Sequence, residues 1–376
     1  MHIQFIFLVV AAVLLSPVYS AAIVPTGVRH RGIEVNLEAL GNSQVRVTVS
    51  NNADHEISVL KMNSFFDESP IQKVNVYRDD DSKEEVLFKG IQPRYDLTHL
   101  TPKNFASLAP GSNITSEFDI ADTLDLSPGG NYTISSQGVF LVGRDTNSSS
   151  ITGVAPYKSN TIKVSIDAAS IANRTRSRLL SHSFTTLAPR TQLDSDSCTG
   201  TQEGEALQTA LQNTVSLSLR AARAARYGDQ RRFEEYFRTT SESVRQDVSS
   251  RFLAIAVEAS SSSSSSSSPS RSSTTYFCTD PLGYCNSNTL AYAIPSRSVI
   301  VNCPLYYRLP DLTTRCHGQD QATTTLHELT HAERVYSPHT VDHAYGYEAS
   351  RALDAEEAVL NADTYALFAN ALEIGC

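Results

Sequence analysis

The sequence predicts two domains of different fold class: a β-sandwich-like half, followed by a mainly α half of the α+β class with one small β-sheet. Three observations carry this prediction. Apolar residues alternate with period two before residue 190, helix-forming residues dominate after it, and all six cysteines lie after it. We therefore place the domain boundary near Arg190 and expect each half to fold around its own core.

Short segments with a strand pattern fill the N-terminal half. Ile33 begins one alternation of apolar and polar residues, Val45 begins another, and Gly41-Asn42 between them predicts a hairpin turn. Further strands are expected at residues 74–77, 85–88, 133–142 and 161–166. A length of about 150 residues with this pattern is typical of a β-sandwich.

The C-terminal half is rich in Leu, Ala, Arg and Glu, which favour helices. Helices are expected at residues 206–226, 229–259 and 348–372, and strands at residues 290–294 and 299–303. A further helix has Asp320 as its N-cap and is stopped by Pro338, so that residues 327 and 331 lie in its middle. We expect this helix to pack on the small sheet.

That helix contains the motif His327-Glu328-Leu329-Thr330-His331. Residues four positions apart point the same way on a helix, so the two imidazoles can share one metal ion. Glu328 lies at the edge of the same face, where it can take a proton from a water at the metal. The motif therefore has the geometry of a zinc peptidase, and the alternative is a pair of surface histidines on an amphipathic helix.

A catalytic zinc site normally has three protein ligands, so a third must follow the helix. The metzincin pattern is excluded, because Arg334 and Ser337 stand where that pattern needs Gly and His. Asp342 is the preferred third ligand, with Tyr345 three residues later as a hydroxyl donor. One alternative is a gluzincin pattern, in which a later glutamate is the third ligand: Glu348, Glu356 or Glu357. The other is a nearby histidine as third ligand, either His339 or His343.

HELTH followed by TVDHAYG resembles the deuterolysin family of secreted fungal zinc metalloendopeptidases, or aspzincins, whose signature is HExxH and then GTxDxxYG. His339 stands in place of the first Gly of that signature, which affects the local turn more than the chemistry. The segments FEEYF, LAYAIPS and NCPLYY, the stretch that ends at Cys285 and CHGQDQATT are also similar. The resemblance thus covers the whole C-terminal half.

The resemblance implies a zincin-type catalytic domain that binds one Zn²⁺ per chain and hydrolyses protein or peptide substrates, with a preference for basic proteins. It implies that His327, His331 and Asp342 bind the zinc. It further implies that Glu328 is the general base and that Tyr345 stabilises the oxyanion.

The six cysteines are even in number and confined to one half, which predicts three disulfides in an oxidising compartment. Sequence alone leaves 15 connectivities for six cysteines. The resemblance implies one of them: Cys198 with Cys278, Cys285 with Cys303, and Cys316 with Cys376.

The N-terminal residues predict secretion. Residues 1–20 have the apolar stretch and small final residues of a signal peptide, and no later run is apolar enough to span a membrane. Four sequons predict a glycoprotein: Asn113, Asn131, Asn147 and Asn173. We therefore expect residues 21–190 to be a propeptide that acts as chaperone and inhibitor, and residues 191–376 to be the catalytic domain.

An arginine-rich segment links the two halves. The resemblance implies cleavage after Arg190, which would leave Thr191 as the new amino terminus, and Arg176 and Arg178 are alternative sites. From Thr191 onward there are 14 arginines and no lysine against 22 acidic residues, so most of the net charge of −9 lies in this half. Such a charge repels nucleic acid and attracts basic partners. Residues 260–268 are all serine and predict a mobile loop without a chemical role.

Two further classes of function compete with the protease. One is a non-catalytic secreted protein with a structural metal, in which four protein ligands would close the site. The other treats the N-terminal half as an adhesive or carbohydrate-binding module. The absence of tryptophan from the sequence argues against sugar stacking in such a module.

Overall fold

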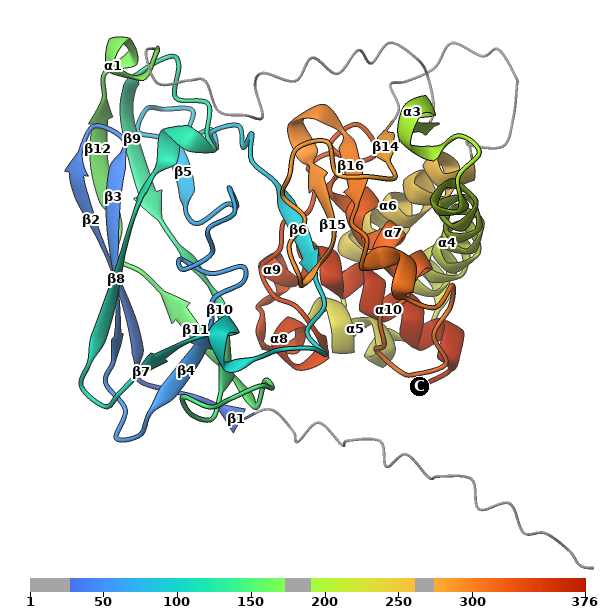
Figure 1. Ribbon diagram of the computed structural model, residues 1–376, viewed down its shortest axis with the longest axis horizontal. Coiled ribbons are helices and arrows are strands. Elements are labelled where there is room, and N and C mark those ends of the chain that lie inside the picture. The colour runs from blue at the N-terminus through green and yellow to red at the C-terminus, as the bar shows by residue number, and fades with distance from the viewer. Residues whose placement is uncertain (1–27, 173–190, 261–273) are drawn as a thin grey trace, which may run out of the picture.

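The computed structural model describes residues 28–172, 191–260 and 274–376. Strands dominate its N-terminal half and helices its C-terminal half (Figure 1). This mixture of helices and sheets agrees with the α+β class predicted from the sequence. The expected signal peptide, the arginine-rich linker with Asn173, and most of the serine run lie outside the described residues. In the part of the chain that the structure describes, no helix is long and apolar enough to cross a membrane.

Three sheets make up the described N-terminal half. The first has five strands in the order β1 (Val28–Arg29), β11 (Gly153–Lys158), β10 (Gln137–Gly143), β4 (Ile57–Leu60) and β7 (Phe105–Leu108). The second has β12 (Ile162–Ile166), β9 (Gly130–Ser135) and β5 (Asn75–Arg78), and the third has β2 (Ile33–Gly41), β3 (Gln44–Asn51) and β8 (Asn113–Asp119). Helix α1 (Ala168–Ala172) follows β12. Apolar side chains from all three sheets form one core.

Most strand predictions in this half are confirmed, and two are wrong in detail. Gly41 and Asn42 have φ angles of 124° and 44° and turn β2 into β3, as the sequence predicts. Residues 85–88 make only isolated bridges, so the predicted strand is a loop. In this loop Val86 and Phe88 are buried and Leu87 is exposed, which explains the strand-like alternation in the sequence. The run 133–142 is interrupted at Ser136 and contributes to β9 and β10, which belong to different sheets.

Among the described helices of the C-terminal half, the one expected at residues 206–226 is confirmed and extends further at both ends, whereas the other expected helices are divided or shorter. The described helices are α3 (Ser195–Cys198), α4 (Gln202–Tyr227), α5 (Gln230–Phe237), α6 (Glu242–Ser260), α7 (Gln321–His331), α8 (Tyr347–Ala352), α9 (Ala355–Val359) and α10 (Ala362–Ile374). The expected helix 229–259 is two helices, because Arg238 adopts a left-handed conformation with φ of 59° and ends α5. The expected helix 348–372 is three helices, because Leu353 is extended and Asp354 and Asn361 each start a new one.

A five-stranded sheet lies beside these helices, in the order β13 (Gln192–Leu193), β14 (Thr275–Phe277), β16 (Val299–Asn302), β15 (Thr289–Ile294) and β6 (Gln92–Tyr95). The two predicted strands, β15 and β16, are confirmed within one residue at each end. The outermost strand, β6, comes from the N-terminal half and was not predicted. In Figure 1 it leaves the left-hand body and runs along β15, next to α7.

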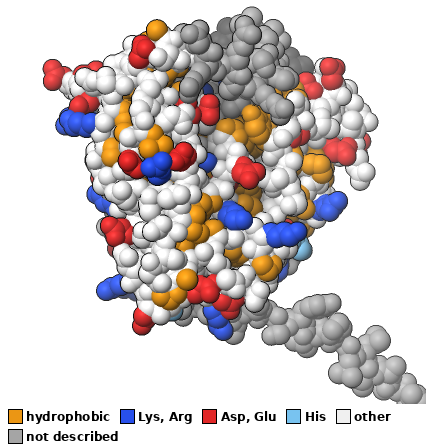
Figure 2. All heavy atoms as spheres, turned by 60° about the vertical axis from the view of Figure 1, so that its left-hand side comes forward, with side chains coloured by type: hydrophobic (Ala, Val, Ile, Leu, Met, Phe, Trp, Pro, Cys, Tyr) orange, Lys and Arg blue, Asp and Glu red, His pale blue; other side chains and the backbone are white. Residues whose placement is uncertain are grey.

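The face of the molecule seen in Figure 2 is mixed in charge. Figure 2 shows acidic and basic side chains scattered over this face, with small apolar groups between them. The sequon residues Asn113, Asn131 and Asn147 are all exposed, so their side chains are accessible for glycosylation.

Candidate metal centre

Helix α7 carries the predicted motif and is fixed at its first turn. The carboxylate of Asp320 accepts a hydrogen bond from the backbone N–H of Thr323 at 2.6 Å, which completes a capping box. The helix ends at His331, well before Pro338, so the expected mid-helix position of this residue is wrong. The loop that contains Asp342 follows the last turn of the helix directly.

The two histidines of the motif meet inside the protein. His327 and His331 are completely buried, and their Nε2 atoms lie 3.2 Å apart. The alternative prediction, that these are two surface histidines on an amphipathic helix, is therefore wrong.

The loop after α7 returns a carboxylate to the same point. Thr340 N–H donates to the carbonyl oxygen of Thr330, which folds the loop back on the helix. Asp342 then places Oδ1 3.2 Å from His327 Nε2 and Oδ2 3.4 Å from His331 Nε2. Ligands held in a tetrahedron at about 2.0–2.2 Å from zinc lie roughly 3.3–3.6 Å from one another. These spacings suit a zinc ion between the three side chains.

The oxygen atoms of two carboxylates around this point accept no hydrogen bond from the described residues. Both oxygens of Asp342 and both of Glu328 are buried without a hydrogen-bond partner among the described residues. A buried carboxylate without a partner is costly, which fits a cation at this position. Burial opposes ionisation of Asp342, but His331 and His327 outweigh it and hold its pKa below the ordinary value.

The outer nitrogens of the two histidines each face an oxygen atom, and only that of His331 makes a hydrogen bond. His331 Nδ1 donates to the carbonyl oxygen of Thr340 at 2.8 Å, so its proton is on Nδ1 and the lone pair of Nε2 is free for a metal. His327 Nδ1 lies 3.4 Å from Asp363 Oδ1, at the start of α10. Both rings are therefore oriented with Nε2 towards the shared point.

Glu328 and Tyr345 have the properties that their expected roles need. Burial raises the pKa of Glu328 to about 8, partly opposed by His327. This value brings the carboxylate close to the basicity of a proton acceptor at neutral pH. Tyr345 is 3% exposed, and burial raises the pKa of its phenol well above the ordinary value, which keeps it a hydrogen-bond donor. Its ring stacks 6.1 Å from that of His327, and its hydroxyl donates to the carbonyl oxygen of Pro93.

The alternative ligands do not join this group. Among the described residues, the cluster around His327 contains His331 and Asp342, and none of the later glutamates. His339 instead donates from Nδ1 to the carboxylate of Glu333. His343, although buried, is also outside the cluster.

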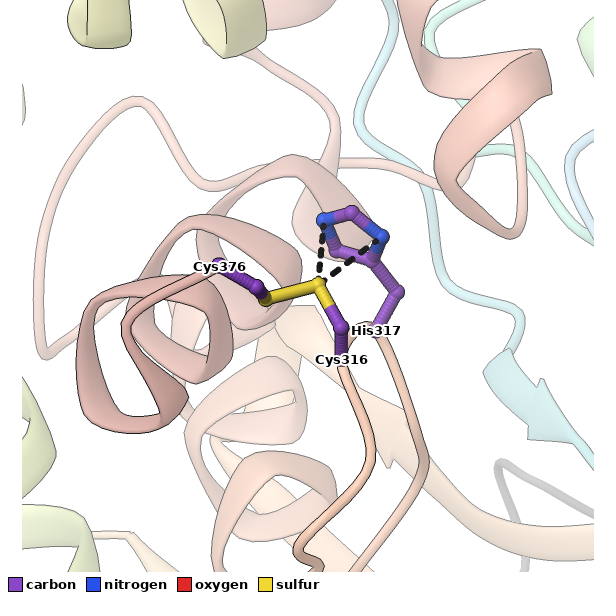
Figure 3. Close-up of side chains that lie close together, drawn as sticks. All are labelled: Cys316, His317 and Cys376. Atoms are coloured by element: carbon purple, nitrogen blue, oxygen red, sulfur yellow. Dashed lines mark hydrogen bonds between the residues drawn. A yellow bond between two sulfur atoms is a disulfide. The ribbon is translucent and has the colours of Figure 1, made fainter. Parts of the chain in front are cut away.

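A second group with metal-ligand atoms lies at the end of the chain: Cys316, His317 and Cys376. Figure 3 shows that the two sulfur atoms are joined to each other, with the imidazole of His317 beside them. This ring stacks on Tyr347 at 3.9 Å and its Nε2 is 2.7 Å from the hydroxyl of Tyr236. With no thiolate available, the group is a structural contact.

The disulfide pairing that the resemblance implied is confirmed. The three bonds join Cys198 to Cys278, Cys285 to Cys303, and Cys316 to Cys376, and no described cysteine is free. The last bond ties the end of α10 to the loop before α7. Both helices that face the cluster are thereby held to each other.

Two residues near the cluster were missed by the sequence analysis. Asp363 was one acidic residue in an alanine-rich segment, and Arg94 was assigned to the other half. The structure brings them together, with Arg94 Nη2 3.3 Å from Asp363 Oδ1 and both side chains buried. An acidic residue in an otherwise apolar helical segment is a signal that could have identified Asp363, whereas no local signal marks Arg94.

A buried pair of helical histidines, an adjacent carboxylate and an acidic residue from a following loop, on an α+β scaffold, define the class of metal-dependent endopeptidases. The chain belongs to the Deuterolysin metalloprotease (M35) family, whose family model matches residues 5–376. The match includes the N-terminal half, beyond the segments that carried the resemblance in the sequence.

Curated relatives agree with this family over nearly the whole length. A neutral protease 2 homologue of Aspergillus oryzae is 45% identical over 363 residues, which are 96% of this chain and 97% of the relative. Penicillolysin of Penicillium citrinum is 42% identical over 345 residues, 92% of each chain. Neutral protease 2 of Aspergillus oryzae is 43% identical over 346 residues, again 92% of each. The protein is therefore a metalloendopeptidase.

Proposed function

We propose that the protein is a secreted zinc endopeptidase made as a proenzyme, with His327, His331 and Asp342 as the zinc ligands. The observation that carries this proposal is the convergence of these three buried side chains at 3.2–3.4 Å from one another. Three disulfides and exposed sequons support the secretory route. Glu348, the gluzincin alternative, has no such convergence to support it.

A zinc ion held by these ligands would polarise the scissile carbonyl and acidify a water beside it. Glu328 accepts the proton of that water on its carboxylate and returns it to the nitrogen of the leaving amine. Tyr345 donates its hydroxyl hydrogen bond to the carbonyl oxygen as negative charge develops there. Both groups are buried, which excludes competing water and strengthens these interactions.

The charge of the C-terminal half supports a preference for basic substrates. Its 22 acidic residues against 14 arginines attract cationic peptides. Comparison of kcat/KM for peptides with lysine or glutamate flanks tests this at low and high salt. A preference for lysine flanks that fades with added salt is expected, and equal rates would contradict it.

Metal analysis together with casein hydrolysis tests the proposed function. We expect one zinc per chain, loss of hydrolysis with a chelator, and recovery when zinc is restored. A purely structural metal predicts one zinc and no hydrolysis at any stage of processing. Sequencing the amino terminus of the secreted form tests the cut: Thr191 is expected, and a start after Arg176 or Arg178 would move the site.

A further inference from the structure

Strand β6 is a peptide from the N-terminal half bound at the edge of the C-terminal sheet. It runs antiparallel to β15, with Arg94 opposite Ala291, Pro93 opposite Tyr292 and Gln92 opposite Ala293. It is the outermost strand of its sheet, so without it the edge of β15 is open. Addition of an extended peptide to an open edge is a common mode of peptide recognition.

The register of β6 brings one of its peptide bonds to the catalytic groups. The carbonyl oxygen of Pro93 accepts the hydrogen bond of the Tyr345 hydroxyl. Under the proposed function, this hydroxyl is the donor to the carbonyl oxygen of a substrate. The bond between Pro93 and Arg94 therefore lies where a substrate's reacting bond would lie.

The side chain of Arg94 anchors the strand. It is 3% exposed, donates from Nη1 to the carbonyl oxygen of Thr323 in α7 at 3.0 Å, and pairs through Nη2 with Asp363 in α10. A buried arginine that loses this partner leaves an uncompensated charge, so the contact resists separation.

The two residues after Arg94 extend the contact. Gln319 donates to the carbonyl oxygen of Tyr95 at 2.9 Å, and Asp96 N–H donates to the carbonyl oxygen of Asn288 at 2.7 Å. One apolar cluster joins Leu60 and Tyr95 of the N-terminal half to Ala349 and Leu353 of the C-terminal half. All four residues of β6 are thus buried between the two halves.

We propose that Gln92–Tyr95 is an intramolecular peptide ligand of the candidate metal centre, held by Arg94 in the register of a substrate, and that it keeps the uncut chain latent. The inference rests on the proposed function and adds the segment, the bond and the anchor through which the N-terminal half acts. The competing explanation is that β6 is a permanent fifth strand, required whether or not the linker is cut. The two explanations differ in one expectation. If β6 is a releasable ligand, weakening the Arg94 contact makes the candidate metal centre accessible to substrate; if β6 is a permanent strand, it does not.

The full-length chain tests this with Arg94→Ala and a matched control, Arg46→Ala. Arg46 lies on β3 and also pairs with two acidic groups, Glu38 and Glu117, but far from the C-terminal sheet. With the uncut state verified by intact mass, hydrolysis of a short fluorogenic peptide is expected to rise at least about tenfold in Arg94→Ala, the change for 1.4 kcal/mol. Arg46→Ala is expected to stay as latent as the unaltered chain. Equal latency of all three would overturn the proposal.

Hydrogen exchange gives a readout that needs no activity. In the Glu328→Gln background, the backbone amides of β15 are expected to exchange at least about tenfold faster when Arg94 is replaced, and at the original rate when Arg46 is replaced. Unchanged protection in both overturns the proposal. Failure of the protein to hydrolyse any peptide would refute the proposed function and leave this exchange result standing.

A peptide added in trans keeps the test open if Arg94→Ala does not fold. The hexapeptide of residues 91–96 is expected to inhibit the secreted, processed protein competitively, and its analogue with alanine for arginine is expected to be at least about tenfold weaker. Absence of inhibition, or equal inhibition by both peptides, overturns the role of Arg94.

Discussion

His327 Nδ1 lies 3.4 Å from Asp363 Oδ1, on the side of the imidazole opposite the Nε2 atom that faces Asp342. This arrangement of carboxylate, histidine and metal position fixes the ring and raises its basicity. Asp363→Asn is therefore expected to lower zinc affinity by about 10- to 100-fold. Competition with a chromogenic chelator measures it, with exposed Asp354→Asn as the control. Equal affinity in both variants would exclude Asp363 as a positioning residue.

Glu328→Gln removes the proposed proton acceptor and keeps the size of the side chain. We expect kcat to fall by at least about a hundredfold, because general base catalysis contributes 10²- to 10⁴-fold. Zinc content is expected to stay at one per chain. Residual activity close to the unaltered enzyme would assign the proton to another group.

Asp342→Ala and Glu348→Gln separate the two candidate third ligands. We expect Asp342→Ala to lose zinc and activity together, with an affinity loss larger than the roughly 100-fold effect of an outer partner. Glu348→Gln is expected to keep both, because Glu348 lies outside the cluster of described ligand atoms. Zinc analysis after gel filtration is sufficient, and the opposite pattern would favour the gluzincin arrangement.

The bond between Cys316 and Cys376 closes a loop of 60 residues, longer than the loop of 18 between Cys285 and Cys303. Replacing both members of the first pair by alanine is expected to lower the free energy of unfolding by about 2–4 kcal/mol. The second pair, treated alike, is expected to cost about 1 kcal/mol less, since a shorter loop restricts the unfolded chain less. Urea unfolding without reductant measures both, and a larger loss from the shorter loop would contradict this.

Glu333 contributes to stability in a pH-dependent way. The hydrogen bond from His339 holds the pKa of Glu333 at about 2, below its ordinary 4.5, against an opposing effect of burial. A carboxylate with a lowered pKa stabilises the fold above its unfolded value, and this contribution is lost as pH falls from about 4.5 towards 2.

The variant Glu333→Gln is therefore expected to melt below the unaltered protein at pH 6, and the gap is expected to shrink as pH falls to 3. Because the side chain is 40% exposed, the difference should stay below about 1 kcal/mol. A gap that widens on acidification contradicts the assignment.

The sequence predicts the local part of the site, because HExxH and the Asp342–Tyr345 spacing are each contained in a short segment. It does not predict the contact of Asp363 with His327 or Arg94, which depends on how α10 and β6 pack on α7. Helix ends show the same limit. Arg238 ends α5 in a left-handed conformation that glycine usually adopts, so composition alone extends that helix to residue 259.

For the disulfides and the strands as well, the sequence predicts one part and not the other. Cysteine count predicts three bonds but not their partners, which only the resemblance implied. The strands β15 and β16 follow from their apolar runs, whereas β6 contains Arg94 and Pro93 and has no strand pattern. The residues of β6 have little strand propensity of their own, and the extended conformation comes from pairing with β15.

An unpaired strand edge invites other chains to pair with it and is a hazard for aggregation. While β6 covers β15, the uncut chain presents no open edge of β15. Under the proposed latency, the same strand would limit misassembly through this edge as well as premature hydrolysis. In that proposal, the edge of β15 would open only after the chain is cut.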